Sequence, residues 1–180
     1  MAIGPIISWQ RFRAALLVIV ISLPISLTSI TAVDAALARP SGEPLLVVTG
    51  KIEQTNVGDA AHLDRQALQA IGMTTLTTSN QFEPGVHTYE GVLLGDLLTY
   101  LGADGSKLIA TALDGYSVEI PVSDARKFPI ILAMIRNGKP MGVRDRGPIW
   151  IIYPIDQFNE LKDEKYSARS IWQLDRIDVQ

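Results

Sequence analysis

Two dipeptides, Asp114-Gly115 and Asn137-Gly138, restrict the fold more than any other feature of this sequence. Each of them separates two apolar runs, and these runs span residues 107–113, 116–122, 130–136 and 140–154. Asp-Gly and Asn-Gly suit two-residue turns whose central residues have positive φ, so each dipeptide predicts a β-hairpin. The sequence therefore predicts antiparallel strand pairing through most of its second half.

Helical patterns are few and short. Asp64 is placed as an N-cap between Leu63 and Leu68, which can form a hydrophobic staple, and Gly72 is placed to end the helix. A second, amphipathic helix is predicted by four leucines at helical spacing, Leu94, Leu97, Leu98 and Leu101.

The strands do not alternate regularly with these helices. Residues 45–52 form an apolar, β-rich run that predicts a buried strand, and residues 170–179 predict the last strand. A doubly wound parallel sheet requires strict strand–helix alternation, which this order of elements lacks. We therefore predict an α+β fold of β-rich mixed sheets with a few short helices.

The first 38 residues have the features of a targeting segment. Arg11 and Arg13 precede an apolar run over residues 14–33, and the small residues Ala36 and Ala38 follow it. Cleavage after Ala38 is predicted, and an uncleaved membrane anchor is the alternative. The predicted organisation is a signal peptide or N-terminal anchor over residues 1–38, a spacer over 39–44 and a single domain over 45–180. The domain is thus expected to be periplasmic or otherwise exported.

Composition excludes several kinds of chemistry. The chain has no cysteine, which removes thiolate ligands and thiol nucleophiles. Its formal net charge of −3, with charges scattered along the sequence, provides no basic face for nucleic acid. His62 and His87 are the only histidines, and neither has the neighbours of a metal site. Ser79 lacks the G-x-S-x-G context of a hydrolase nucleophile.

Basic residues near the C-terminal half are candidates for an anion site. Arg144 and Arg146 lie in the loop sequence RDRG, where their guanidinium groups can form a fork for a phosphate or carboxylate. Arg–Asp pairing on a solvated loop is the alternative. Arg169, in a segment of mixed charge, can contribute to an anion pocket or to a solvated face.

Aromatic residues are predicted to serve the core. Trp150, Tyr153 and Trp172 lie in strand-like runs, and we expect them to pack inside rather than contact a ligand. A polar stretch, residues 77–91 (TTSNQFEPGVHTYEG), remains without an assignment from these patterns. Its hydroxyls can simply cap the end of a strand.

Five stretches occur in the order found in a known family. They are TYEGVLLGDLLTYLGA, GYSVEIPVSDA, IILAMIRNGKPM, RGPIWIIYP and IWQLDRIDV. In this order the chain resembles the oxidoreductase molybdopterin-binding domain, which has the sulfite oxidase fold. The resemblance covers nearly all of residues 45–179.

The resemblance implies a cofactor site in the polar stretch. In the family, one cysteine and the pterin dithiolene hold molybdenum. Counting back from Gly91 places the cysteine position near Ser79, or at Thr78 if the loop length differs. This chain has no cysteine there, and Ile171-Trp172-Gln173 departs from the basic residue of the family's last strand. The cofactor-binding candidates implied by the resemblance are Thr78, Ser79, Asn80, His87, Arg144, Arg146 and Arg169.

Three functions are consistent with these observations. The first is an exported binding or accessory module that holds a pterin, a small anion or an envelope protein without cysteine-ligated molybdenum. The second is a small molybdenum-pterin oxidoreductase acting on an oxyanion or S-oxide, with a hydroxyl or solvent in place of the thiolate. The third is a docking or sensory subunit of an envelope complex. Nucleic acid is not expected as a partner, and membrane contact is expected only through an uncleaved leader.

Overall fold

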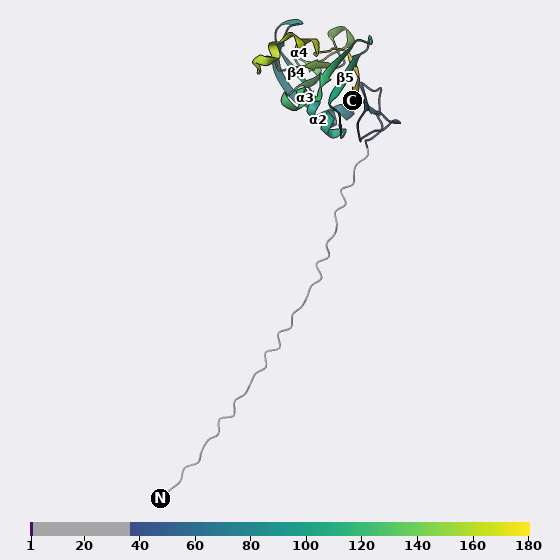
Figure 1. Cartoon of the computed structure of the whole chain (residues 1–180), viewed down its shortest axis with the longest axis vertical. Coiled ribbons are helices and arrows are strands. Elements are labelled where there is room, and N and C mark those ends of the chain that lie inside the picture. Colours follow the sequence, from purple (N-terminus) through teal and green to yellow (C-terminus); the bar gives the residue numbers. More distant parts are fainter. Residues whose placement is uncertain (2–36) are drawn as a thin grey trace. The chain divides into compact units, whose positions relative to one another are not determined.

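The computed structural model describes Met1 and residues 37–180, so almost all of the predicted leader lies outside the described residues. Within the described part, no helix is long and apolar enough to cross a membrane. Residues 37–180 form a mixed α+β fold of mostly strands, in two sheets, with a few short helices (Figure 1). The α+β, β-rich class predicted from the sequence is confirmed.

The first sheet joins the beginning and the end of the domain. Its five strands, in spatial order, are β2 (Ala61–Leu63), β1 (Leu46–Gly50), β10 (Leu174–Val179), β5 (Lys107–Ala112) and β6 (Ser117–Pro121). Strands β1 and β10 run parallel, whereas the other pairs are antiparallel. The predicted β5–β6 hairpin is confirmed, but its turn is not the predicted two-residue type. The backbone N–H of Ala112 donates to the Tyr116 carbonyl oxygen, and of the three residues between them only Gly115 has a positive φ, 85°.

The second sheet is antiparallel. Its strands are β3 (Thr74–Asn80), β4 (Glu83–Leu93), β7 (Ile131–Arg136) and β8 (Lys139–Pro140), and β9 (Trp150–Ile152) also pairs with β7. The β7–β8 hairpin turns at Asn137-Gly138, whose φ values are 50° and 73°. Positive φ at both central residues is what the sequence predicted for this turn.

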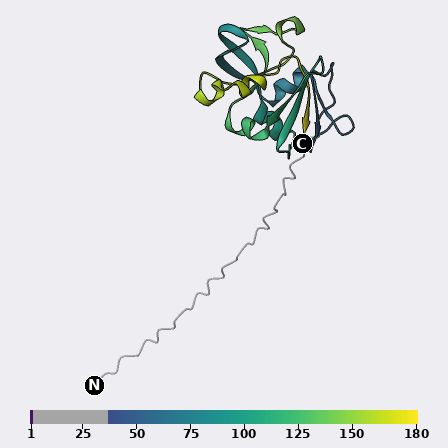
Figure 2. The same cartoon turned by 45° about the horizontal axis from the view of Figure 1, so that its top comes forward.

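Helices cover parts of both sheets. Their bounds are α1 (Arg65–Ile71), α2 (Leu94–Tyr100), α3 (Val122–Lys127) and α4 (Glu164–Ala168), with 3-10 turns η1 (Val143–Asp145) and η2 (Asn159–Lys162). Figures 1 and 2 show α2 and α3 close together, with α4 apart from them. The predicted helix after Asp64 and the leucine-rich helix are both confirmed.

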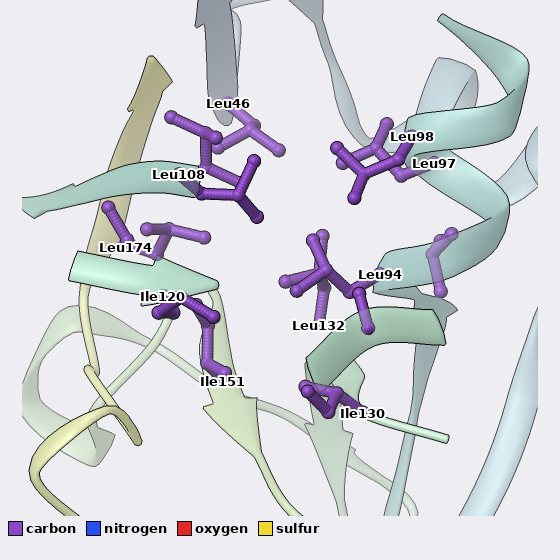
Figure 3. Packing of buried hydrophobic residues seen from close by; sticks show 14 of the residues in the cluster. Leu46, Leu94, Leu97, Leu98, Leu108, Ile120, Ile130, Leu132, Ile151 and Leu174 are labelled. Atoms are coloured by element: carbon purple, nitrogen blue, oxygen red, sulfur yellow. The ribbon is translucent and has the colours of Figure 1, made fainter. Parts of the chain in front are cut away.

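Most buried apolar side chains form one core between the first sheet, helices α1 to α3 and one face of the second sheet. In Figure 3, Leu46 and Leu108 of the first sheet point toward Leu97 and Leu98 of α2, with Leu132 of β7 nearby. Burial of each such leucine contributes about 1.5–3 kcal/mol to folding. The amphipathic pattern of α2 therefore reflects its position against this core.

A second, smaller core lies on the other face of the second sheet. Tyr89 and Trp150 are fully buried there, together with Ile131. Leu132, which follows Ile131, and Ile151, which follows Trp150, belong to the main core. Strands β7 and β9 are therefore buried on both faces, which explains why their sequences are continuously apolar instead of alternating.

One carboxylate fastens the segment before β1 to α1. Asp64, the N-cap of α1, accepts hydrogen bonds from the backbone N–H groups of Ala67 and Ser41 at 2.8 Å and of Gly42 at 3.0 Å. These hydrogen bonds hold the pKa of Asp64 below its ordinary value of 3.8, and the bond from Ala67 has the largest effect. The folded state thus stabilises the ionised form of the Asp64 carboxylate.

We expect Asp64→Asn to be less stable than the wild type at pH 7. Because the folded-state pKa is depressed, the contribution of the charge is present above pH 3.8 and is lost as the pH falls through the folded value. The stability difference between the two proteins should therefore shrink as the pH falls from 7 toward 2. Urea unfolding across this range measures it, and a difference that stays constant with pH would contradict the role of the charge.

Candidate functional site

The hydroxyls of Thr78 and Ser79, at the end of β3, are held by structural contacts. Thr78 is fully buried and donates to the Ser79 carbonyl oxygen at 3.1 Å. Ser79 donates to the Asp156 carboxylate from its backbone N–H at 2.6 Å and from Oγ at 2.7 Å. These hydrogen bonds hold the pKa of Asp156 below its ordinary value, and the bond from the Ser79 backbone has the largest effect. The Thr78 hydroxyl also accepts from the backbone N–H of Asp156 at 3.4 Å, so both hydroxyls attach the loop after β9 to the end of β3.

Asn80 organises the turn between β3 and β4. Its side-chain oxygen accepts from the backbone N–H groups of Phe82 and Glu83 at 2.8 and 3.0 Å. Its amide nitrogen donates to the Tyr89 hydroxyl at 2.6 Å. Burial, and then the Glu83 carboxylate, raises the pKa of Tyr89 to about 12, so this hydroxyl is protonated at neutral pH. Asn80 thereby fixes the backbone that carries Phe82 and Glu83.

Glu83 forms the central ion pairs of this region. Its Oε1 accepts from Arg136 of β7 and from Arg146, and Arg146 also donates to the Phe82 carbonyl oxygen at 3.1 Å. Among the described residues, Glu83 Oε2 has no hydrogen-bond partner. Arg146 therefore pairs with a carboxylate that is far away in the sequence, whereas Arg144 of η1 is exposed. The two loop arginines do not form the fork that the sequence suggested.

Arg169 belongs to a different ion pair. It donates to Asp124 Oδ2 at 2.7 Å, and the same oxygen accepts from the Tyr153 hydroxyl at 3.1 Å. Burial, and then the Asp124 carboxylate, raises the pKa of Tyr153. Arg169 and Arg146 thus pair with separate carboxylates and do not converge on a common anion.

His87 contacts neighbouring turns. One ring nitrogen, Nδ1, lies 3.0 Å from the side-chain amide nitrogen of Asn137, and Nε2 lies 3.0 Å from the Pro84 carbonyl oxygen. His87 pairs with Thr78 across β3 and β4. Asn80 and Arg146 come together differently, through the Phe82-Glu83 segment that both contact.

Arg146 lies over two indole rings. Its guanidinium carbon is 5.1 Å from the centre of the Trp150 ring and 5.6 Å from that of Trp172. Phe82 makes an edge contact with Trp172, with 5.1 Å between ring centres, and Trp150 makes another at 6.4 Å. Cation–π and edge-to-face contacts of this kind each contribute about 0.5–1.5 kcal/mol. Together they hold the Trp172 ring in place.

Trp172 forms one wall of a cavity of about 320 Å³. Phe82 and Tyr116 form two further aromatic walls. The other lining residues are Ala112, Asp114, Ser167, Ala168, Ser170 and Ile171. The β5–β6 turn, the end of α4, the segment before β10 and the β3–β4 turn therefore all contribute to this cavity. Among the residues that the structure describes, the lining is mainly apolar and contains one carboxylate and no basic side chain.

The prediction that Trp172 packs in the core is wrong, because 37% of this residue is exposed. For Trp150 and Tyr153, which are 0% and 1% exposed, the same prediction is confirmed. Trp172 precedes β10, whose pairing starts at Leu174, and the intervening Gln173 has a φ of 53°. Strand alternation consequently does not extend back to Trp172.

Three further lining residues, Phe82, Asp114 and Tyr116, are not among the site candidates from the sequence. Asp114 is predicted only as a turn residue and Tyr116 only as the start of a strand. The position of Asp114 and Tyr116 at a predicted turn is the feature of the sequence that could indicate a site, since binding residues are concentrated on loops that a rigid scaffold holds in place. Tyr116 is 58% exposed, which is unusual for an aromatic side chain at the start of a strand.

The donor set does not fit the molybdenum centre that the resemblance implies. The chain has no thiolate, and the alcohol groups of Thr78 and Ser79 would need deprotonation to bind a metal. Both alcohols are also engaged in structural hydrogen bonds. Within residues 37–180, no three His, Asp or Glu side chains form a group that could hold a metal ion.

Fold and site together define an α+β domain with an aromatic-walled cavity. A scan against models of protein families finds no match to this chain, and a search of curated proteins also finds none. The function is therefore inferred from the site itself.

Proposed function

We propose that this chain is an exported binding module without redox catalysis, and that its ligand site is the aromatic cavity beside Trp172. The observation that carries the proposal is the lining of this cavity, which combines three aromatic rings with a few polar groups. Ligand sites in proteins are typically concave, mainly apolar and about 300–1,000 Å³ in volume. At about 320 Å³, this cavity suits a small molecule rather than a dinucleotide.

The arrangement around the cavity supports a fixed binding surface. Phe82 is positioned by Asn80, and Trp172 is held by Arg146, which in turn pairs with Glu83. A preorganised site loses less conformational entropy when a ligand binds. The polar cluster at the β3–β4 turn therefore acts indirectly, by positioning two of the three aromatic walls.

We also propose that the domain is related to the sulfite oxidase fold of oxidoreductase molybdopterin-binding domains. Residues of the shared motifs occupy places where the backbone demands them. A Cβ at Gly91 would lie 2.0 Å from the Leu132 carbonyl oxygen, so only glycine fits between β4 and β7. Asn137 and Gly138 supply the positive φ values of the β7–β8 turn. These constraints support a common architecture without requiring the cofactor.

Replacing Trp172 with alanine is expected to weaken ligand binding at least tenfold, because one aromatic wall is lost. Ligand-observed NMR of the full chain, with a set of neutral, cationic and anionic aromatic and branched aliphatic fragments, measures the binding. The matched control is Tyr100→Ala, since Tyr100 is also an exposed aromatic residue (46%) but lies on α2 and does not line the cavity. Equal loss in both variants, or no fragment bound by the wild type, would argue against the site.

Elemental analysis tests the absence of redox catalysis. Protein purified from the exported fraction of a molybdenum-replete host is expected to contain no stoichiometric molybdenum, because the chain lacks a suitable ligand. One molybdenum atom per chain, with pterin fluorescence after oxidation, would contradict the proposed binding module and support an oxidoreductase instead.

A further inference from the structure

The cavity beside Trp172 has the composition of a cation-binding aromatic cage. Three different aromatic side chains, Phe82, Tyr116 and Trp172, contribute to its walls, and Asp114 contributes a carboxylate. The faces of aromatic rings carry negative electrostatic potential and attract organic cations, most strongly in the case of tryptophan. A cavity with aromatic walls and one carboxylate thus favours a positively charged ligand over a neutral one.

The distribution of charge around the cavity points the same way. Within residues 37–180, no lysine, arginine or histidine lines it. Arg146 contacts the Trp172 ring but is not among the lining residues, and its charge is partly offset by Glu83, which it shares with Arg136. Asp114 is exposed, and its Oδ1 accepts from the backbone N–H of Tyr116 at 2.9 Å, which restrains the carboxylate at the β5–β6 turn. An anionic ligand, such as a phosphate, would meet a carboxylate here and no cation.

The apolar part of the lining distinguishes between kinds of cation. A primary ammonium ion needs hydrogen-bond acceptors to replace its water, whereas a methylated ammonium is weakly hydrated and presents apolar methyl groups. Ala112, Ala168 and Ile171 offer apolar surface to such groups. Ser170 is 8% exposed, and its hydroxyl already donates to the Tyr166 carbonyl oxygen at 3.1 Å.

We propose that this cavity binds a small quaternary or multiply methylated ammonium group. The inference rests on the proposed function of the cavity and specifies the class of its ligand. The Trp172 and Tyr116 rings contact the methyl groups, and Asp114 supplies the balancing charge. The group can belong to a free metabolite of the choline type or to the headgroup of a lipid that carries the same ammonium.

The test compares a cation with its uncharged isostere. Choline chloride and 3,3-dimethylbutan-1-ol, which has carbon in place of the nitrogen, are titrated separately into the full ¹⁵N-labelled chain. The indole N–H resonance of Trp172, assigned by its loss in Trp172→Phe, reports binding. Sodium chloride at the same ionic strength is the blank. We expect choline to bind about 3- to 30-fold more tightly than the alcohol, which corresponds to the range of cation–π energies.

Asp114→Asn separates the role of the carboxylate from that of the rings. It is expected to reduce choline affinity several-fold and to leave the affinity for the alcohol unchanged. Sedimentation with phosphatidylcholine vesicles, compared between wild type and Trp172→Ala so that any contribution of the N-terminal segment cancels, distinguishes a lipid headgroup from a free ligand. Tryptophan-dependent binding to either source supports the inference.

Other results would overturn the inference in recognisable ways. Equal affinities for choline and the alcohol would remove the preference for a cation but leave the cavity as a binding site for apolar groups. Binding of aromatic fragments without any binding of choline would have the same meaning. No binding of choline, the alcohol or any fragment would overturn both the ligand class and the proposed function.

Discussion

Replacing Trp150 with alanine is expected to lower the free energy of unfolding by about 3–5 kcal/mol, the usual range for removing a large buried aromatic side chain. Trp150 is 0% exposed, and its ring packs against Tyr89 at 6.0 Å and Phe82 at 6.3 Å between ring centres. Its indole N–H donates to the Ser170 carbonyl oxygen at 3.1 Å. Alanine therefore leaves a cavity and removes the donor to this carbonyl.

Chemical denaturation of Trp150→Ala and Trp172→Ala provides the comparison. Trp172 is partly exposed, so its removal should cost clearly less stability than that of Trp150. Trp150→Phe retains most of the ring but not the N–H donor, and an intermediate loss of about 1–3 kcal/mol is expected. A Trp150→Ala protein within about 1 kcal/mol of the wild type would mean that the smaller core is not tightly packed.

The second large effect concerns the ion pairs of Glu83. Glu83→Gln keeps the size of the side chain but removes the charge that two arginines share, and we expect a loss of about 2–3 kcal/mol. The exposed fractions are 16% for Glu83, 22% for Arg136 and 32% for Arg146, so solvent compensates only partly. Urea unfolding at neutral pH measures the loss.

Two comparisons make the Glu83 prediction specific. The pair Lys107–Glu119 is 41% and 58% exposed, so Glu119→Gln should change stability by less than about 1 kcal/mol. Combining Glu83→Gln with Arg136→Met should cost less than the sum of the two single changes, because the double variant no longer leaves Arg136 without its partner. Strict additivity, or equal effects at Glu83 and Glu119, would show that the arginines do not depend on this carboxylate.

Local chemistry explains which parts of the fold could be predicted. The two hairpin turns depend on positive φ values at Gly115 in one and at Asn137 and Gly138 in the other, and the residue types at those positions encode that preference. The N-cap at Asp64 likewise needs a side chain only three residues from its donor, Ala67. Features that span a few residues are therefore readable from the sequence.

The candidate site could not be predicted in this way. Glu83 and Arg146 are separated by 63 positions, and neither residue has a pattern that identifies the other. The cavity joins Phe82, Tyr116 and Trp172 from three distant segments, so it exists only after both sheets are packed. Trp172 was placed in the core because strand-like alternation was extended past the irregular Gln173. Tertiary packing decides these positions, and local periodicity does not record it.

The position of β10 in the first sheet has a consequence for biosynthesis. The last strand of the domain lies between β1, the first, and β5, and pairs with both. A chain emerging from the ribosome therefore has β1 and β5 without their shared neighbour until β10 has been made. Closure of the first sheet must wait for β10, because the contacts between β1 and β10 join distant parts of the domain. A nascent chain that has not yet reached this strand therefore remains incompletely folded.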